Sequence, residues 1–503
     1  MRNFKLFAKC IVVIKIMKIG GLRIMVNLKA RMPRPRIGLL AIGHFYYWPQ
    51  FPRLREMSLR MYTKLRQHLD KIGDVFTPGL VDSMEKSQKA GEFFRKQNID
   101  ILFIFPLQYS TGMTVVPAVK DLDVPIRILN AHEDSSYDYK TADTAIYLHH
   151  EGVCCVPEIA GTLLCLGKKF KVRTGPFSSQ RLWDEVRADC IGAAAARVFR
   201  SLNFGLIGET YRLSKEGSSM GMTDMPIDEH RLLRATGKLL IHPEVEEIEE
   251  AYHRVTEEQL EDMYRQFREM YDVDETVTNE HMKESAKIAI AFDEIIRKKY
   301  NIHAFGYYWW GEKTFVTQLR AQSALAVSRL AALGHPGVTE GDVKAAMAMK
   351  VLDLLGGGGM FVEFFSMDFD ENFILLGHDG PVNINMAEGR ARLKHLEIHH
   401  GKSGHGLGID FEIKKGPATL LNLTQFDAGN TFKLIYTVGE VIPGPILNIG
   451  NPNCRFRVKR PIHEFIDAWC QEGPEHHSAL GIGDLSREIE AFAEAMKFRC
   501  VRI

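Results

Sequence analysis

The regular alternation of short apolar runs with helical segments, which begins at Arg36, restricts the possible folds most strongly. The run at 36–42 reads RIGLLAI, and the run at 101–105 reads ILFIF. Both have the length and composition of buried parallel strands. Strand-like stretches at 74–77 and 125–129 and helical stretches at 54–71 and 83–97 complete the pattern. This alternation predicts an α/β fold with an open, doubly wound parallel sheet, flavodoxin-like or Rossmann-like.

The loop after the first of these strands does not match a nucleotide-binding motif. It reads A-I-G-H-F-Y-Y-W-P and lacks the G-x-G-x-x-G spacing that cradles a pyrophosphate. The sequence therefore gives no support for a dinucleotide cofactor.

The rest of the chain predicts two further domains. A long helix at 180–202 leads into a second α/β region with strand-like segments at 206–209 and 239–241 and helical segments at 244–271 and 280–300. Four glycines at 356–359 mark a flexible boundary. Short β-rich runs separated by Gly, Pro and Asn follow, and they predict an antiparallel barrel or sandwich. We therefore expect an open parallel-sheet domain at 34–176, a middle α/β domain at 177–357 and an antiparallel β-rich, barrel-like domain at 358–503.

The first 33 residues form a basic extension that we exclude from the fold. No acidic residue precedes Glu56, and the apolar run at 10–17 is interrupted by Lys15 and is too short to span a bilayer. A small-residue cleavage site of the secretory kind is absent from this stretch. It is either a basic targeting peptide or the product of a misassigned start at Met25 or Met32. We favour the second interpretation and expect residues 1–33 not to fold.

Composition narrows the class of protein. The formal net charge is +1, so no basic surface indicates nucleic acid binding and no membrane partner is expected. The eight cysteines include no C-x-x-C pair, which argues against structural zinc and against a disulfide framework. A reducing, cytoplasmic location fits this cysteine usage best.

Ligand-type side chains in unusual settings define a candidate metal site in the last third of the chain. Glu340 stands in T-E-G-D, Glu363 interrupts the apolar run M-F-V-E-F-F, His378 stands in L-L-G-H-D-G-P, and His477 ends the pair in G-P-E-H-H-S. Carboxylates and imidazoles together hold divalent transition metals, and carboxylates can also move protons. Two carboxylates with two imidazoles suit Mn²⁺, with Mg²⁺ or Co²⁺ as alternatives.

The order of these motifs resembles the carboxy-terminal part of L-arabinose isomerases, a group related to the L-fucose isomerases. That family carries a G-E-G-D-x-K stretch, an F-M-E-D-Y strand, a G-x-H and a final A-H-H-T. The present chain has T-E-G-D-V-K, F-V-E-F-F, L-G-H-D-G and E-H-H-S. The resemblance implies that Glu340, Glu363, His378 and His477 bind the metal and that Glu340 and Glu363 are also catalytic. It further implies a homohexamer whose active site is shared between neighbouring subunits.

The predicted chemistry is the interconversion of an aldose and a ketose. A metal that binds O1 and O2 of a small aldose makes the proton on C2 more acidic. A carboxylate can then carry that proton between C2 and C1 through an enediol, a general acid–base step worth ~10²–10⁴-fold. The sequence leaves open which glutamate is the base and whether a hydride shift operates instead.

Two aromatic loops are the candidate substrate contacts. They are Gly43–Trp48 and the stretch at 106–110, and they supply His44, Tyr46, Gln108 and Tyr109 as candidate sugar-binding residues. Aromatic faces and amides suit a sugar, although aromatic rings also plug domain interfaces. The family has Q-x-L-Y and M-H-T-F-S-P at these places, whereas this chain has Gly43 in place of the Gln and Leu107 in place of the His. We therefore expect L-arabinose to be a poor substrate and another aldose, such as a deoxy sugar fitting Leu107 and the aromatic loop, to be better.

Three alternatives remain open. The histidine-rich stretch with His395, His399, His400 and His405 competes as a metal site, but neighbouring residues such as His399 and His400 point to opposite faces of a strand. The protein could instead be an epimerase or lyase that acts on a sugar or sugar acid. It could also be a sugar-binding protein without catalytic activity.

Overall fold

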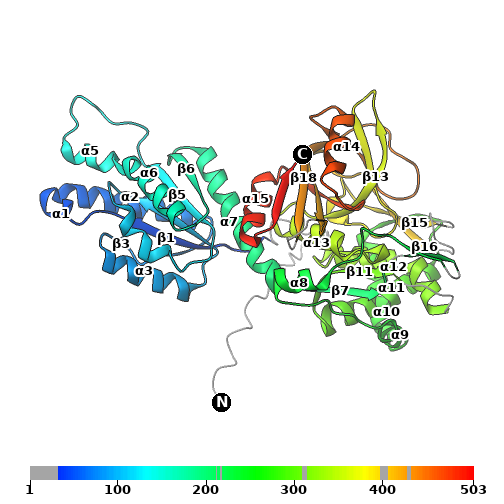
Figure 1. Cartoon of the computed structure of the whole chain (residues 1–503). Coiled ribbons are helices and arrows are strands. Elements are labelled where there is room, and N and C mark those ends of the chain that lie inside the picture. The colour runs from blue at the N-terminus through cyan, green and yellow to red at the C-terminus, as the bar shows by residue number, and fades with distance from the viewer. Residues whose placement is uncertain (1–31, 211, 216–217, 309–313, 397–405, 427–431) are drawn as a thin grey trace, which may run out of the picture. The chain divides into compact units, whose positions relative to one another are not determined.

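The computed structural model describes residues 32–210, 212–215, 218–308, 314–396, 406–426 and 432–503 (Figure 1). The chain divides into two units. The N-terminal unit comprises Pro33–Arg200 with Arg487–Arg499, and the C-terminal unit comprises Ser201–Ser486 with Cys500–Ile503.

A parallel sheet forms the centre of the N-terminal unit. Its strand order is β2-β1-β4-β5-β6, and β3 pairs with the carboxyl end of β1 beyond β2. The strands are β1 (Arg36–Ile42), β2 (Asp74–Phe76), β3 (Leu80–Val81), β4 (Ile101–Pro106), β5 (Ile126–His132) and β6 (Phe170–Pro176). All of their pairings are parallel.

Helices cover both faces of this sheet because successive strand residues point to opposite sides. Leu40 belongs to the apolar cluster that contains Phe94 of α3 and Ile159 of α6, whereas Leu39 belongs to the cluster that contains Leu65 of α2. The helices are α1 (Tyr47–Gln50), α2 (Pro52–Asp70), α3 (Met84–Gln97), α4 (Val116–Val119), α5 (Thr144–His150), α6 (Gly152–Cys165), α7 (Gln180–Ser201) and α15 (Ser486–Met496). The predicted doubly wound sheet is confirmed.

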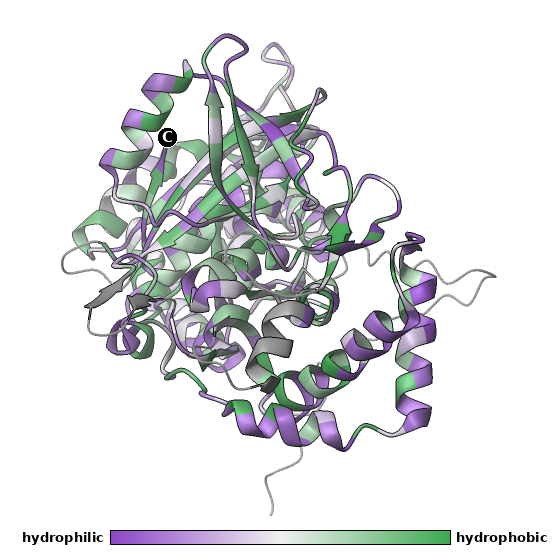
Figure 2. Cartoon of the chain, turned by 90° about the vertical axis from the view of Figure 1, so that its right-hand side faces the viewer, coloured by the Kyte–Doolittle hydropathy of each residue, from purple (hydrophilic) through white to green (hydrophobic). Residues whose placement is uncertain are grey.

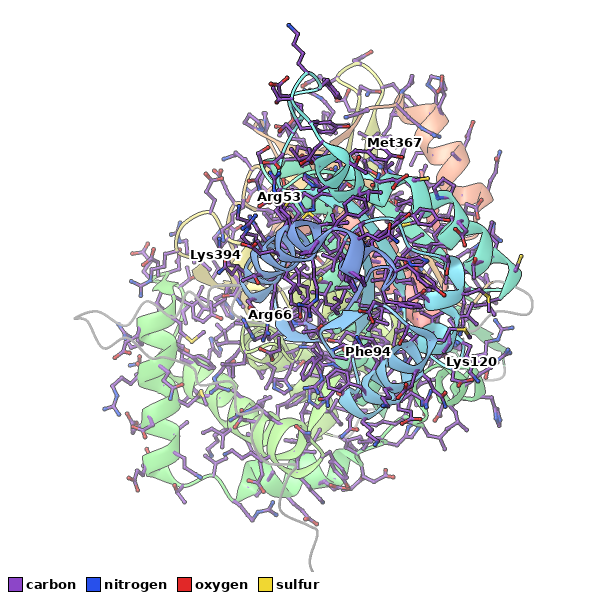
Figure 3. The ribbon with its side chains drawn as sticks, turned by 90° about the vertical axis from the view of Figure 1, so that its left-hand side faces the viewer. Arg53, Arg66, Phe94, Lys120, Met367 and Lys394 are labelled. Atoms are coloured by element: carbon purple, nitrogen blue, oxygen red, sulfur yellow. The ribbon has the colours of Figure 1, made fainter. Side chains whose placement is uncertain are left out.

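Charged side chains cover the outside of the N-terminal unit. Arg53, Arg66 and Lys120 lie on its surface, and each side chain is at least half exposed (Figure 3). Their ion pairs with nearby carboxylates are solvent-facing, so they contribute little to stability.

The first part of the C-terminal unit is a smaller parallel sheet of order β12-β11-β7. Its strands are β7 (Asn203–Gly208), β11 (Ile302–Tyr308) and β12 (Gly337–Val338). Its helices are α8 (Glu229–Thr236), α9 (Val245–His253), α10 (Glu257–Met270), α11 (Asn279–Phe292), the π-helix η3 (Asp293–Lys299), α12 (Thr314–Ala332) and α13 (Val343–Leu354). Two small sheets join β8 (Arg212–Lys215) to β9 (Ser218–Gly221), and β15 (Arg392–Leu396) to β10 (Asp272–Val273) and β16 (Gly406–Asp410).

The second part of the C-terminal unit is an antiparallel barrel. The strand order is β17-β20-β13-β14-β19-β18-β21, and an additional β17–β18 pairing closes the ring. The strands are β13 (Met360–Asp368), β14 (Phe373–Gly377), β17 (Gly416–Thr424), β18 (Lys433–Ile442), β19 (Asn453–Val458), β20 (Ser478–Ile482) and β21 (Arg499–Arg502), and α14 (Ile462–Gln471) follows β19. The antiparallel β-rich region predicted from the sequence is confirmed, in the barrel form.

Helix α13 links the small parallel sheet to the barrel. It contacts β11 on one side and β17 and β20 on the other, and all of its residues are buried. Most barrel strands are buried along most of their length, β14 throughout, and Figure 2 shows hydrophobic residues along them. Within the part of the chain that the structure describes, no helix combines the length and the apolar character needed to cross a membrane.

Candidate metal centre

Glu340 lies in a tight turn that connects β12 to α13. The turn Thr339–Gly341 is a 3₁₀ helix in which Glu340 has φ +66°, a left-handed conformation that is strained for residues other than glycine. Gly341 follows with φ +73°, and a Cβ atom there would lie 2.3 Å from the carbonyl oxygen of Glu209. This close packing against the end of β7 fixes the turn. The Glu340 side chain is 27% exposed.

His378 and His477 meet at the end of three neighbouring barrel strands. His378 follows β14 and His477 precedes β20, and both strands pair with β13 between them. Both imidazoles are buried, and their Nε2 atoms lie 3.1 Å apart. The Glu340 carboxylate faces the same point, with oxygens 3.9 Å from Nε2 of His378 and 3.8 Å from Nε2 of His477.

The partners of the other ring nitrogens fix the tautomers of both histidines. Nδ1 of His378 lies 2.7 Å from the carbonyl oxygen of Asp379, which can only accept a hydrogen bond. Nδ1 of His477 lies 2.9 Å from Oδ2 of Asp342. Burial would raise the pKa of Asp342, but the hydrogen bond from His477 and the charge of Lys344 lower it, so the carboxylate is ionised and accepts. Both imidazoles therefore carry their proton on Nδ1.

With the proton on Nδ1 in both rings, Nε2 of each neutral imidazole is an acceptor. Two buried acceptors at 3.1 Å repel unless a cation or a proton lies between them. Neutral Nε2 atoms whose Nδ1–H groups are held by a carbonyl and a carboxylate are the usual form of metal-bound histidine. The ligand atoms of Glu340, His378 and His477 all lie within 4.8 Å of one another, so these residues fit a divalent metal ion.

Glu363 belongs to a second, overlapping group with His476 and His477. It lies on β13 and pairs in register with Gly377, the residue before His378. Burial raises the pKa of Glu363, which favours the protonated carboxyl at this position. Glu363 is thus next to the metal-binding group but outside the set formed by Glu340, His378 and His477.

His476 is held by Asp224. Its Nδ1 atom and its backbone N–H both contact Oδ2 of Asp224, at 2.5 and 3.0 Å. Burial alone would lower the pKa of His476, but the hydrogen bond to Asp224 raises it. The sequence motif predicts only the second histidine of the pair as a ligand, and neither His476 nor Asp224 was predicted to take part in the site.

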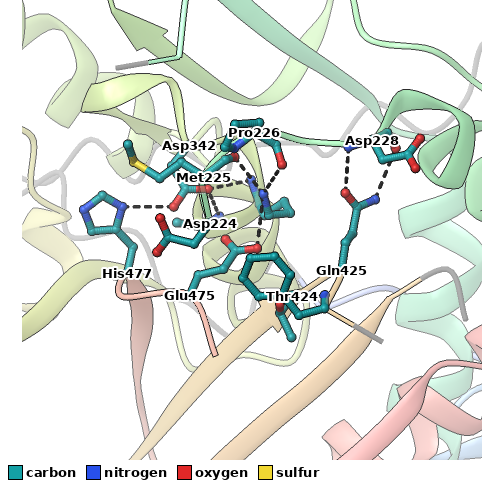
Figure 4. A network of polar contacts seen from close by, with 12 residues as sticks. Asp224, Met225, Pro226, Asp228, Asp342, Thr424, Gln425, Glu475 and His477 are labelled. Atoms are coloured by element: carbon teal, nitrogen blue, oxygen red, sulfur yellow. Dashed lines mark hydrogen bonds and ion pairs between the residues drawn. The ribbon is translucent and has the colours of Figure 1, made fainter. Parts of the chain in front are cut away.

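A buried polar network connects the loop before β20 to the start of α13 (Figure 4). Nζ of Lys344 lies 2.6 Å from the carbonyl oxygen of Met225, 2.7 Å from that of Pro226 and 3.1 Å from Oε1 of Glu475. Burial raises the pKa of Glu475 well above its ordinary value, although Lys344 acts in the opposite direction. The network holds the loop that carries His477 in one position relative to Asp342.

The candidate sugar-binding residues all lie in the N-terminal unit, at the carboxyl ends of β1 and β4. The rings of His44 and Tyr109 are stacked with centroids 6.4 Å apart, and Tyr46 is 62% exposed. Gln108 is fully buried and donates from its amide nitrogen to the His44 carbonyl at 3.3 Å. Their role in sugar binding stays a prediction.

Two substitutions relative to the family pattern have a structural explanation. A Cβ atom on Gly43 would lie 2.9 Å from the Trp48 indole, so the indole fills the space beside this residue. Leu107 is fully buried in the core of the N-terminal unit. The expectation that a deoxy sugar would contact Leu107 was therefore wrong, because its side chain packs under the sheet edge.

The competing histidine cluster is described only in part. His395 lies at the end of β15, with its ring stacked on His281 at 4.6 Å. His399, His400 and His405 lie outside the described residues.

Comparison with known proteins assigns the region that carries these residues to a known family. The L-arabinose isomerase central domain family matches residues 238–358, and the L-arabinose isomerase C-terminal domain family matches residues 358–499. Every strand and turn that carries Glu340, Glu363, His378 or His477 lies inside these two matches. The chain is L-arabinose isomerase-like.

Curated relatives give the same result. The L-arabinose isomerase of Thermotoga maritima is 28% identical to this L-arabinose isomerase-like chain over 270 residues, which is 52% of this chain and 53% of that protein. The enzyme of the same name from Clostridium beijerinckii is 23% identical over 265 residues, 50% of this chain and 51% of that protein. The matched region thus spans about half the length of these relatives.

Proposed function

We propose that this protein is a divalent-metal-dependent aldose–ketose isomerase that acts on a small aldose. The observation that carries the proposal is the convergence of Nε2 of His378 and Nε2 of His477, 3.1 Å apart, on the Glu340 carboxylate. Two imidazoles and a carboxylate that converge in this way are suited to hold a divalent cation. The L-arabinose isomerase-like sequence of the whole C-terminal unit from residue 238 onward supports the reaction class.

Glu340, Glu363, His378 and His477 would hold the metal ion, as the sequence resemblance implies. The ion would polarise the sugar carbonyl and stabilise the negative charge that develops on oxygen during enolisation. Mn²⁺ suits this mixture of carboxylate and imidazole ligands, and Mg²⁺ and Co²⁺ are the alternatives.

The residues around the site have separate tasks. Glu363 would also carry the proton between C2 and C1 of the sugar as a general acid–base group. The Phe361 ring lies 4.0 Å from His378 and 4.5 Å from His477, centroid to centroid, and it keeps water from one side of both imidazoles. Asp342 holds His477 in the tautomer that presents Nε2.

The finer parts of the proposal rest on the family resemblance. We place the protein in the cytoplasm as a homohexamer whose active sites are shared between neighbouring subunits. The candidate sugar contacts of the N-terminal unit, His44, Tyr46, Gln108 and Tyr109, would then serve the distal end of the sugar. Gly43 stands in place of the family's first-loop glutamine, and the Trp48 indole fills the space that a side chain at this position would occupy. We therefore propose a substrate other than L-arabinose.

The test is ketose formation by the full chain, stripped of metal and then supplied with Mn²⁺. L-arabinose, D-arabinose, L-fucose, D-ribose and D-galactose form the panel, and kcat/KM is compared between them. We expect metal-dependent ketose formation from at least one aldose, with L-arabinose not the preferred one. Ketose formation from none of the sugars, or activity that is indifferent to the metal, would disprove the proposal. Epimerised product without ketose would place the protein in the epimerase class instead.

A matched pair of variants tests the role of Glu363. Glu363→Gln removes the proton-carrying group while keeping its size, and we expect kcat to fall by ~10²–10⁴-fold. Glu371→Gln changes an exposed carboxylate near the β13–β14 turn and should leave kcat unchanged. Equal effects of the two variants would remove Glu363 from the mechanism.

A further inference from the structure

A cavity opens at the carboxyl edge of the parallel sheet in the N-terminal unit. It has a volume of about 260 Å³ and is lined by the ends of β4, β5 and β6 and by the start of α6. Ligands of open α/β sheets bind outside the carboxyl ends of the strands. The metal centre proposed above lies in the C-terminal unit and uses none of these residues.

Two histidines and one aspartate converge in this cavity. His132 is the last residue of β5, Asp134 follows two residues later, and His150 is the last residue of α5. One ligand atom from each lies within 4.8 Å of the other two. Oδ2 of Asp134 is 3.9 Å from Nδ1 of His132 and 4.0 Å from Nε2 of His150.

The two imidazoles are fixed, whereas the carboxylate can adjust. The side chains of His132 and His150 are 17% and 15% exposed, and their ring centroids are 3.8 Å apart. The Asp134 side chain is 56% exposed. Tetrahedral ligands around a metal at ~2.1 Å are ~3.4 Å apart. A shift of the Asp134 carboxylate by roughly half an ångström would therefore bring Oδ2 to the ligand spacing from both imidazole nitrogens.

The charge of the surroundings suits a cation. Glu133 adds a second carboxylate to the same loop and is paired with Lys64 at 2.5 Å.

One local hydrogen bond opposes the binding of an ion. The backbone N–H of Asp134 donates to Nδ1 of His132 at 3.0 Å. Losing such a hydrogen bond costs little, because water or another acceptor replaces most of its energy. A metal–imidazole bond is far stronger, so the exchange is favourable once the ion is present.

We propose that His132, Asp134 and His150 form a second binding site, for a Zn²⁺ or Co²⁺ ion, in the N-terminal unit. Two imidazoles and one carboxylate are the ligand set of zinc sites that keep an open position. The open position faces the cavity, so the ion can bind an oxygen atom of a further ligand there. This site is independent of the isomerase proposal.

The test counts Co²⁺ ions bound by the full chain after chelation, with the visible absorption of Co²⁺ and metal analysis as readouts. We expect two equivalents in the wild type. Asp134→Asn and His150→Ala should each lose one equivalent, because the Kd for Co²⁺ at that site rises by more than about 100-fold. Removal of an outer partner of a metal ligand alone lowers metal affinity by ~10–100-fold. Glu151→Gln, which changes the carboxylate next to His150, should keep both equivalents.

A variant of the other centre separates the two proposals. His378→Ala should lose one equivalent and keep the one that depends on Asp134. The Co²⁺-induced rise in Tm that survives in His378→Ala should disappear when Asp134→Asn is added. Wild-type stoichiometry in both Asp134→Asn and His150→Ala would overturn the second site, whatever the result for His378→Ala.

Discussion

At the scale of single residues, the chemistry of the site depends on which nitrogen of His477 carries the proton. Asp342 decides this, because its ionised Oδ2 accepts from Nδ1 and leaves the Nε2 lone pair for a ligand. Its other oxygen accepts from the backbone N–H groups of Lys344 and Ala345 and caps α13. One carboxylate thus starts the helix and sets the tautomer.

We predict that Asp342→Asn lowers Mn²⁺ affinity by ~10–100-fold with little change in Tm. Asn caps a helix about as well as Asp, but its NH₂ group would face Nδ1 of His477 and favour the tautomer that blocks Nε2. Isothermal titration calorimetry and thermal unfolding measure the two effects. Asp228→Asn, at the equivalent cap of α8, is the control and should leave metal affinity unchanged. Unaltered affinity in Asp342→Asn would contradict the tautomer argument.

At this scale the sequence predicted the candidate ligand residues but not their partners. Glu340, Glu363 and His378 stood out because charged or ligand-type groups occupied glycine-rich or apolar settings. Asp224 gave no such signal, since it lies in a polar loop and acquires its role only when that loop reaches His476. Contacts between residues this far apart in the chain require the fold.

At the scale of elements, the turn before α13 positions Glu340. The turn can adopt this backbone conformation because Gly341 follows Glu340 and because the turn packs against Gly306 of β11. A Cβ atom added to Gly306 would lie 2.6 Å from the carbonyl carbon of Gly341. The turn and the strand therefore approach backbone to backbone.

We predict that Gly341→Ala destabilises the C-terminal unit and weakens metal binding, whereas Gly237→Ala only destabilises it. The two glycines have φ of +73° and +76°, so each alanine is strained by ~1–2 kcal/mol. Only at Gly341 would the Cβ also meet a backbone oxygen, at 2.3 Å, while at Gly237 it would meet nothing within 4 Å. Mn²⁺ affinity, compared between the variants by calorimetry, separates strain from displacement. Equal affinities would show that the turn tolerates movement.

We predict that His335, in the connection from α12 to β12, makes the free energy of unfolding depend on pH. His335 follows α12, its Nδ1 lies 2.7 Å from the Ile302 carbonyl oxygen, and burial lowers its pKa to about 4 from 6.5. As the pH falls from 6.5 to 4, the unfolded chain binds a proton there and the folded chain does not, so this residue's contribution to stability is lost. At pH 5 the loss is about 2 kcal/mol.

Urea unfolding at pH 7.5 and pH 5 measures this contribution. We expect His335→Asn to lose about 2 kcal/mol less than the wild type between the two pH values. His463→Asn, at an exposed position on α14, should lose as much as the wild type. A wild-type pH dependence in His335→Asn would show that His335 is not the group responsible.

The elements themselves could be predicted where the apolar pattern is unambiguous. The strand predicted at 36–42 and the long helix predicted from residue 180 correspond closely to β1 and α7. The strand predicted at 239–241 is reduced to one bridge between Ile241 and Gly205. Leu239 is 53% exposed, and Pro243, which lacks an N–H, follows closely and prevents a longer ladder.

At the scale of the whole molecule, different observations support the predicted folds of the two units. The family matches cover residues 238–499, which include the metal centre and the barrel. The parallel sheet of the N-terminal unit could be predicted from the sequence pattern alone, because buried parallel strands read as continuous apolar runs, whereas its strand order comes from the structure. The closure of the barrel could not be predicted in the same way, since it depends on the pairing of β17 with β18 and β20 across long sequence separations.

The central claim is that Glu340, His378 and His477, with Glu363 beside them, hold one divalent ion. A crystal structure of the full chain soaked in Mn²⁺, with an anomalous difference map at the manganese edge, tests it most directly. We predict a peak at ~2.0–2.4 Å from Nε2 of both histidines and from a Glu340 oxygen, with Glu363 turned toward it. A map in which manganese is absent from this position, or in which its peak lies more than about 3 Å from either Nε2 atom, would contradict the claim.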